Sequence, residues 1–130
     1  MMRRGSAPQP TPAELEILQA LWARGPSTVR QVQEALARNP PIRYTTVLKL
    51  LQIMTEKGLV SRDERERTHV YRAAVNERAT KKRMVVDLLD RAFEGSSLGL
   101  VQQALSARPA RPEELRELRK LLDRMTREEP

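Results

Sequence analysis

Apolar residues recur at helical spacing in the first part of the chain, and polar capping residues mark where each helix begins. Thr11-Pro12-Ala13-Glu14 combines an N-cap hydroxyl, a proline at the first helical position and a glutamate three residues after the cap. This pattern predicts a helix from residue 12 that ends before Gly25-Pro26. The side chains expected to form its apolar face are Leu15, Leu18, Leu21 and Trp22.

A second, shorter helix is predicted directly after the first. Thr28-Val29-Arg30-Gln31 forms another capping box, and Asn39-Pro40-Pro41 follows the last residue that fits the helical pattern. The side chains expected to be buried along this helix are Val29, Val32 and Leu36.

The stretch from Tyr44 to Lys57 separates polar from apolar side chains most clearly. On a helical wheel, Lys49, Gln52 and Glu56 fall within about 40 degrees of Thr45. The opposite side of the wheel carries Val47, Leu50, Leu51 and Met54. We therefore expect one face of this helix to pack in the core and the other to bind a ligand, and we expect Gly58 to be the C-cap.

Two short strands are predicted beyond Gly58, over residues 59–62 and 68–72, with the charged hairpin tip 63–67 between them. Three helices followed by a two-stranded hairpin predict a mainly α protein of the winged helix-turn-helix class. In that fold the third helix enters the major groove of DNA, and the hairpin, or wing, contacts the backbone or the minor groove.

The rest of the chain is predicted to form three more helices, which carry more apolar surface than they can bury by themselves. Pairing with a second copy would bury this surface, so the sequence predicts a homodimer. The alternative is that these helices fold back as an intramolecular lid. The side chains expected at the dimer interface are Val85, Leu88, Leu89, Leu115, Leu118, Leu122 and Met125.

These patterns divide the chain into three expected parts. Residues 1–10 are expected to be a flexible basic arm, residues 11–75 the winged helix-turn-helix domain, and residues 76–130 the helical dimerisation region. No apolar run approaches the roughly 20 residues that cross a bilayer, and the first ten residues lack the apolar segment of a secretory signal. We therefore expect a soluble, cytoplasmic protein without membrane insertion.

The composition argues against metal and thiol chemistry. The chain has no cysteine and a single histidine, His69, which leaves no disulfide, no thiolate metal site and no pair of histidine ligands. No glycine-rich phosphate loop and no nucleophile in a recognisable setting accompany the acidic residues. We expect no metal, no other cofactor and no enzymatic activity, and we expect His69 to be a partly buried packing residue.

The net charge of +7 favours a polyanionic partner, because phosphate neutralisation by lysine and arginine releases counterions. The excess lies in the first part of the chain, where residues 1–75 hold 12 basic and 7 acidic side chains, net +5. The four aromatic residues are too few for the stacking platforms of single-strand binders. Double-stranded DNA is therefore the expected partner.

The candidate DNA-binding residues lie on the third helix and on the hairpin tip. They are Arg43, Tyr44, Thr45, Thr46, Lys49, Gln52, Arg65 and Arg67. Hydroxyls at the helix N-terminus suit phosphates or thymine methyl groups, Lys49 suits a guanine edge or a phosphate, and Gln52 suits adenine. Two alternatives stay open: an ordinary solvated helix face with a solubilising turn, and a winged-helix module that binds protein without specific DNA binding.

Several segments resemble the penicillinase-repressor family of bacterial winged-helix regulators, the BlaI/MecI group with its copper-responsive relatives. The similarity is carried by residues 13–18 with Trp22, by 44–51, by 56–60 with Val70-Tyr71, and by Glu113-Glu114-Leu115. It extends over roughly residues 11–125. The resemblance implies a homodimeric repressor on a palindromic operator, often upstream of genes for β-lactam resistance.

The resemblance also implies how such a repressor is released from DNA. A membrane sensor protease acts indirectly and triggers cleavage in the helical dimerisation part. The scissile Asn-Phe pair of the family aligns with Gln103-Ala104, which departs from it in both residues. The copper-responsive relatives carry a paired-cysteine motif that this chain lacks, so copper sensing by that route is not expected.

Overall fold

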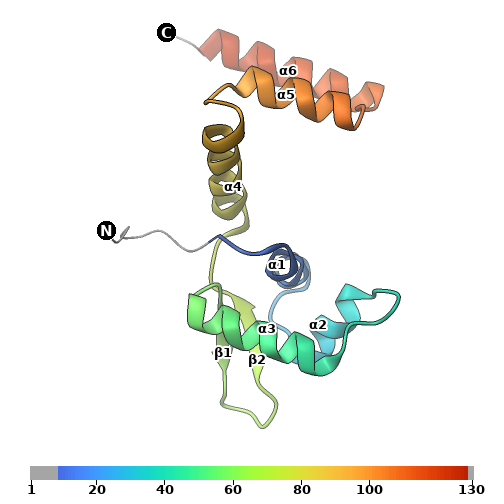
Figure 1. Cartoon of the computed structure of the whole chain (residues 1–130), viewed down its shortest axis with the longest axis vertical. Coiled ribbons are helices and arrows are strands. Elements are labelled where there is room, and N and C mark those ends of the chain that lie inside the picture. The colour runs from blue at the N-terminus through green and yellow to red at the C-terminus, as the bar shows by residue number, and fades with distance from the viewer. Residues whose placement is uncertain (1–8, 129–130) are drawn as a thin grey trace. The chain divides into compact units, whose positions relative to one another are not determined.

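The computed structural model describes residues 9–128, so most of the predicted basic arm, residues 1–8, lies outside the described residues. The chain divides into two compact units, one ending at Val85 and the other beginning at Val86, and we describe each by itself. The elements of the described part, shown in Figure 1, are α1 (Pro12–Arg24), α2 (Val29–Leu36), α3 (Tyr44–Lys57), β1 (Val60–Asp63), β2 (Val70–Ala73), α4 (Glu77–Ala92), α5 (Ser97–Ala107) and α6 (Pro112–Glu128).

Reciprocal side-chain hydrogen bonds cap the first two helices, as the sequence predicts. The Glu14 backbone N–H donates to Thr11 Oγ1 at 3.2 Å, and the Thr11 N–H donates to Glu14 Oε1 at 3.0 Å. Thr28 and Gln31 repeat this arrangement at 3.2 and 2.9 Å. Each box satisfies two donors that the helix itself leaves free, and this fixes where the helix begins.

The core of the first unit lies where α1, α2, α3 and the hairpin meet. Its buried apolar side chains are Ile17, Leu18, Leu21, Val29, Val32, Val47, Leu51, Met54, Leu59, Val60 and Tyr71. The expected apolar face of α1 is partly wrong. Ile17 is fully buried, whereas Leu15 and Trp22 are half-buried. The helix is turned so that Glu14 joins the buried side, and Trp22 at the edge donates its indole N–H to the Val75 carbonyl at 3.0 Å.

The hairpin forms as predicted, with each strand starting slightly later than expected. β1 and β2 pair antiparallel, with Val60 opposite Ala73 and Asp63 opposite Val70. Leu59 precedes β1 because its N–H donates to the Met54 carbonyl at the end of α3. Three helices and this hairpin form a winged helix-turn-helix, which confirms the predicted fold class.

A backbone bridge ties the hairpin to the segment before α2. The Ser27 N–H donates to the Tyr71 carbonyl at 2.9 Å, and the Tyr71 N–H donates to the Ser27 carbonyl at 2.8 Å. Ser27 is buried, and Tyr71 is 1% exposed. The base of the wing therefore lies against the start of α2.

The second unit consists of the end of α4 and helices α5 and α6. The Gly95 N–H donates to the Leu89 carbonyl at the end of α4, and Ser96 caps α5 by accepting from the Gly99 N–H at 2.9 Å. Among residues 86–128 no side chain is fully buried. Within the described part of the chain, no helix has the length and apolar character needed to cross a membrane.

One buried ion pair connects the first turn of α1 to the last turn of α3. Lys57 Nζ donates to Glu14 Oε1 at 2.7 Å, and the side chains of Glu14 and Lys57 are 4% and 28% exposed. Burial raises the pKa of the Glu14 carboxyl, but the hydrogen bonds from Lys57 and Thr11 outweigh burial, so the pKa is lower than its ordinary value. The ion pair thus holds the C-terminal end of α3 against α1.

We expect Glu14→Gln to lower the free energy of unfolding at neutral pH by on the order of 2 kcal/mol, because Lys57 then lacks its carboxylate. Because the folded-state pKa is the lower one, the stabilisation is complete above the unfolded pKa near 4.5 and is lost as pH falls through the folded value. We therefore expect urea unfolding of the wild type and of Glu14→Gln, from pH 7 into the acid range, to show a difference in the free energy of unfolding that decreases below pH 4.5.

Glu16→Gln is the matched control, since Glu16 lies on the same helix in an exposed pair with Arg38. Exposed pairs contribute little to stability. If Glu14→Gln and Glu16→Gln unfold alike at neutral pH, the Glu14–Lys57 pair does not stabilise the fold.

Candidate nucleic-acid interface

Helix α3 exposes the polar face that the sequence predicts. Thr45, Lys49, Gln52 and Glu56 are exposed, and the opposite side of the helix is buried in the core. The helix ends at Gly58, whose φ of +81° is the left-handed C-cap conformation that glycine adopts without strain. The rotation of α3 about its axis is therefore as predicted.

The N-terminus of α3 has no side-chain cap. Arg43 occupies the N-cap position in an extended conformation, and its side chain makes no capping hydrogen bond. The amides of Tyr44 and Thr45 are the first two of the helix and have no carbonyl one turn earlier in the helix. Arg43, Tyr44, Thr45 and Thr46 are all exposed around this end, where the helix dipole favours an anion.

Tyr44 also connects α3 to α2. The Arg30 guanidinium lies over its ring, 5.4 Å from the ring centroid, in cation–π geometry. The Tyr44 side chain is 40% exposed. In the sequence, residues 28–31 are recognisable only as a helix cap, so Arg30 was not predicted to lie beside α3.

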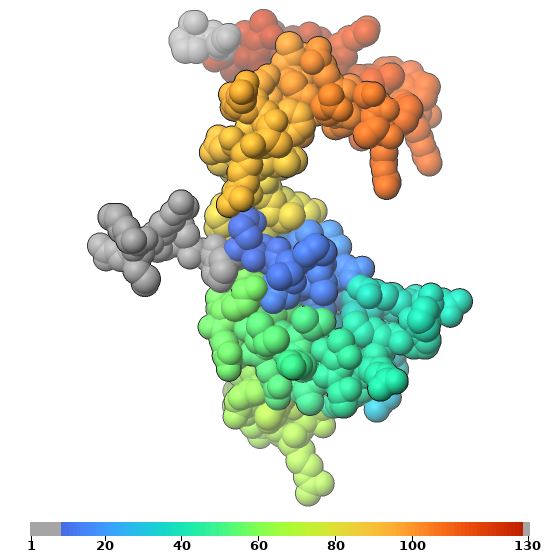
Figure 2. Space-filling model, viewed as in Figure 1, coloured from blue at the N-terminus to red at the C-terminus, as the bar shows by residue number. Residues whose placement is uncertain are grey.

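The wing arginines differ in their pairing. Arg65 Nη2 donates to Asp63 Oδ2 at 2.8 Å, and the Arg65 backbone N–H donates to Oδ1 at 3.0 Å. These bonds lower the pKa of the Asp63 carboxyl to about 2. Arg67 takes part in no ion pair among the described residues. In Figure 2 the hairpin tip, in yellow-green, projects from the first unit.

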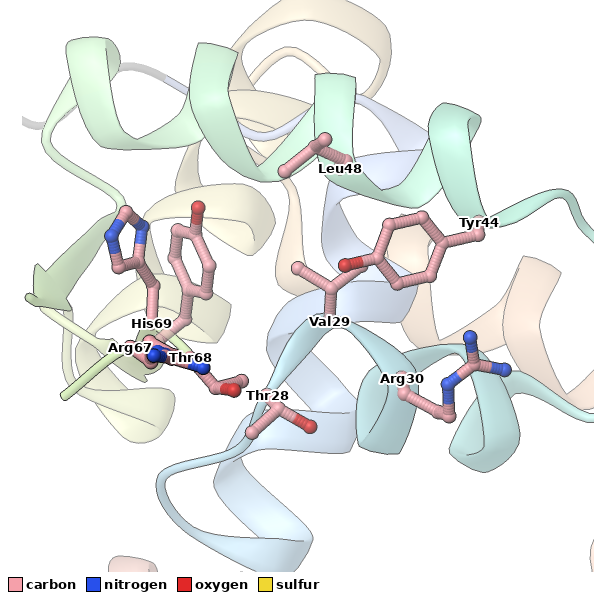
Figure 3. A pocket seen from close by; sticks show the side chains of 9 residues that line it. Thr28, Val29, Arg30, Tyr44, Leu48, Arg67, Thr68 and His69 are labelled. Atoms are coloured by element: carbon pink, nitrogen blue, oxygen red, sulfur yellow. The ribbon is translucent and has the colours of Figure 1, made fainter.

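A hollow of about 380 Å³ lies between the start of α2, the first turns of α3 and the strand side of the wing. In Figure 3, Tyr44 and Leu48 come from α3, Val29 and Arg30 from α2, and His69 from the wing. The full lining is Thr28, Val29, Arg30, Tyr44, Leu48, Arg67, Thr68, His69 and Tyr71. His69 is half-buried, as expected.

The remaining candidate residues lie outside this interface. Of the expected dimer residues, Val85, Leu88, Leu115, Leu122 and Met125 are 44 to 62% exposed, and Leu89 and Leu118 are half-buried. The Gln103-Ala104 pair lies inside α5 and is exposed. Within residues 9–128, no group of three His, Cys, Asp or Glu side chains is placed to hold a metal ion.

Comparison with known proteins finds relatives among bacterial transcriptional regulators. The chain is 35% identical over 85 residues to the transcriptional regulator BlaI of Mycobacterium tuberculosis, from strain CDC 1551 / Oshkosh and from strain H37Rv. The aligned region covers 65% of this chain and 62% of the length of those relatives.

Two solved structures are also similar to this chain. The Bacillus licheniformis BlaI monomeric form in complex with the blaP half-operator shares 23% identity over 55% of this chain and 88% of that one, with a TM-score of 0.47. A MarR family protein from Bacillus stearothermophilus shares 24% identity over 89% of this chain and 75% of that one, with a TM-score of 0.48. The family model described as penicillinase repressor matches residues 10–124. Since this match spans most of the sequence, the chain belongs to the penicillinase repressor family.

Proposed function

We propose that this protein is a transcriptional repressor that binds a palindromic operator as a homodimer, with residues 11–75 as the DNA-binding domain and 76–130 as the dimerisation region. The observation that carries the proposal is the exposed polar face of α3, Thr45, Lys49 and Gln52, on a winged helix-turn-helix. This face lies in a part of the chain with a net charge of +5. Membership of a family of repressors supports the same function.

The uncapped start of α3 is the proposed phosphate anchor. Backbone amides at a helix N-terminus bind phosphate, and the Thr45 and Thr46 hydroxyls and the Arg43 guanidinium lie at the same end. Farther along the helix, Lys49 contacts a guanine edge or a phosphate and Gln52 contacts adenine. In this proposal the N-terminal end of α3 positions the helix on the DNA backbone, and Lys49 and Gln52 recognise the base sequence.

Arg67 is the proposed principal wing contact. It is exposed and outside the ion pairs of the hairpin, whereas the charge of Arg65 is largely compensated by Asp63. A DNA phosphate would have to compete with a carboxylate that holds Arg65 through both its side chain and its backbone N–H. We therefore propose that Arg65 contributes less than Arg67.

Residues 76–130 are the proposed dimerisation region because most of their apolar side chains are not buried within the single chain. Most of the predicted interface residues are exposed in the single chain. Burial of apolar surface against a second copy is the favourable term that would hold two such units together. Two copies would also place two recognition helices on the two halves of an inverted repeat.

We propose that an upstream signal releases the repressor, with control of a β-lactam resistance or related stress operon as the physiological role. A membrane sensor protease acting indirectly would lead to cleavage at Gln103-Ala104. Both residues are exposed but lie in the helical backbone of α5. Cleavage there would require local unfolding of α5, since a helical backbone keeps its hydrogen-bonding groups paired within the helix.

The first test is a mobility-shift titration of promoter fragments from the host, with a random duplex of equal length for comparison. A dimer with on the order of 6 to 10 phosphate contacts loses roughly a thousandfold in affinity between 50 and 200 mM salt.

Lys49→Ala weakens operator binding by about 1–3 kcal/mol if Lys49 contacts a base, and weakens binding to the operator and to the random duplex alike if it contacts a phosphate. Its exposed position predicts no change in thermal stability.

Lys120→Ala is the control for Lys49→Ala. It also removes one positive charge, but from α6, outside the proposed DNA interface. Binding that does not depend on salt, or equal affinities for the two variants, contradicts the proposed interface. A winged-helix module that binds protein would give that result.

The wing pairing generates a second prediction. Asp63→Asn releases Arg65 and adds a phosphate contact, so the plot of log affinity against log salt concentration steepens by about 0.9 per added contact. Glu66→Gln removes a carboxylate of the same wing that forms no ion pair in the described structure, and it is the matched control. An equal slope for both variants means that Asp63 does not restrain Arg65.

The dimer is tested by Leu118→Asp combined with Leu122→Asp. Burying two unpaired carboxylates in the interface costs several kcal/mol, so the variant sediments as a monomer at concentrations where the wild type is a dimer. Lys120→Asp with Arg124→Asp adds the same groups on the other side of α6 and should leave the dimer intact. A wild type that is monomeric at tens of micromolar contradicts the homodimer and favours an intramolecular lid.

A further inference from the structure

The start of α3 is held differently from the starts of α1 and α2. Thr11 and Thr28 cap the first two helices with their own side chains, whereas Arg43, the N-cap residue of α3, forms no capping hydrogen bond. Among the described residues, no hydrogen bond uses the amides of Tyr44 and Thr45. The first turn of α3 therefore depends for its position on contacts from outside the helix.

One such contact comes from Gln33, in the middle of α2. The Gln33 side-chain amide Nε2 donates to the Ile42 carbonyl at 3.0 Å. Gln33 and Ile42 are both half-buried, and the Ile42 side chain packs against the core. The residue directly before the N-cap of α3 is therefore held through both its side chain and its backbone.

A second contact comes from Arg30, which lies about one turn earlier on α2. Its guanidinium lies over the Tyr44 ring, 5.4 Å from the centroid, and Figure 3 shows the two side chains, one from each helix. Residues three apart are neighbours on the surface of a helix, so α2 presents Arg30 and Gln33 to α3 together. The two contacts lie on either side of Arg43, one at Ile42 and the other at Tyr44.

Both contacts leave the first amides of α3 unoccupied. Gln33 binds a carbonyl and Arg30 lies on an aromatic ring, so neither side chain accepts a hydrogen bond from the helix. A threonine or aspartate at the N-cap would instead accept from the amide of the second or third helical residue. An anion at a helix N-terminus needs these same N–H groups. The start of α3 is thus held in place without the loss of its anion-binding donors.

We propose that Arg30 and Gln33 are positioning residues for DNA binding, which hold the start of α3 while its amides stay free for a phosphate. This role rests on the proposed function, because it concerns the proposed phosphate anchor. Arg30 acts through Tyr44 and Gln33 acts through the Ile42 carbonyl, so neither has to touch DNA. When a contact is lost, the start of α3 spends less time in the position that binds DNA, and operator affinity falls by the same factor.

Amide hydrogen exchange on the full-length protein without DNA tests the positioning. Gln33→Met keeps the length of the side chain and removes its amide, and Arg30→Met removes the cation. The Thr46 and Val47 amides both donate to the N-cap carbonyl at 3.1 Å, so they report on the first turn of α3. We expect each variant to speed exchange at these two amides about fivefold, whereas Leu51, farther along α3, exchanges as in the wild type.

Gln19→Met and Arg78→Met are the matched controls. They make the same two substitutions at exposed positions on α1 and α4. We expect both controls to leave exchange in the first turn of α3 and operator affinity as in the wild type.

Operator binding separates positioning from direct contact with DNA. We expect Arg30→Met to weaken operator binding about tenfold, because both subunits of a dimer lose the cation–π contact, and to leave the salt dependence unchanged. In a Tyr44→Leu background, Arg30→Met should weaken binding no further, since the ring through which Arg30 acts is absent. A phosphate contact would instead add to the effect of Tyr44→Leu, and its loss would reduce the slope of log affinity against log salt concentration by about 0.9.

Four results overturn the positioning role: unchanged exchange at Thr46 and Val47 in either variant, exchange that rises equally at Leu51, unchanged operator affinity, or an effect of Arg30→Met that is additive with Tyr44→Leu. Failure of the proposed function gives a different pattern. The wild type then binds no operator, while both variants still speed exchange in the first turn of α3.

Discussion

The two backbone hydrogen bonds between Ser27 and Tyr71 fix how the winged helix-turn-helix unit is assembled. They join the base of the wing to the segment that leads into α2, and both residues are buried at this point. The wing, the start of α2 and the start of α3 therefore occupy fixed positions around one hollow. The bridge acts together with the burial of Val60 and Tyr71 in the core, and both distinguish this hairpin from an isolated two-stranded ribbon, which is marginally stable in water.

The local features of the fold were predictable from the sequence, because their causes lie within a few residues. Both capping boxes formed, since a threonine and a glutamate or glutamine three residues later satisfy each other. The rotation of α3 was predictable for a similar reason. Its polar and apolar residues are cleanly separated on the helical wheel, so only one orientation buries Val47, Leu51 and Met54.

Features that depend on residues far apart in the sequence were not predictable. α1 is rotated away from its most obvious apolar stripe because Lys57, on another helix, stabilises Glu14 on its buried side. The hollow was missed because it exists only when β2 pairs with the segment before α2, which no local pattern signals. On the wing, acidic and basic residues alternate over 63–67, and the sequence does not show which arginine is paired. In the structure Arg65 pairs with Asp63, and Arg67 forms no ion pair within residues 9–128.

The absence of a fully buried side chain from residues 86–128 makes this unit unlike the first one, which has its own core. In the dimer that we propose, association and folding of these helices are linked by mass action. The fraction of chains in which the helices are stably folded then depends on the concentration of the protein in the cell. A newly made, unpaired chain exposes α5 and α6 to proteolysis more than a paired one does. Unpaired chains would thus be degraded faster than chains in dimers. The protein that accumulates in the cell would therefore be mostly dimeric.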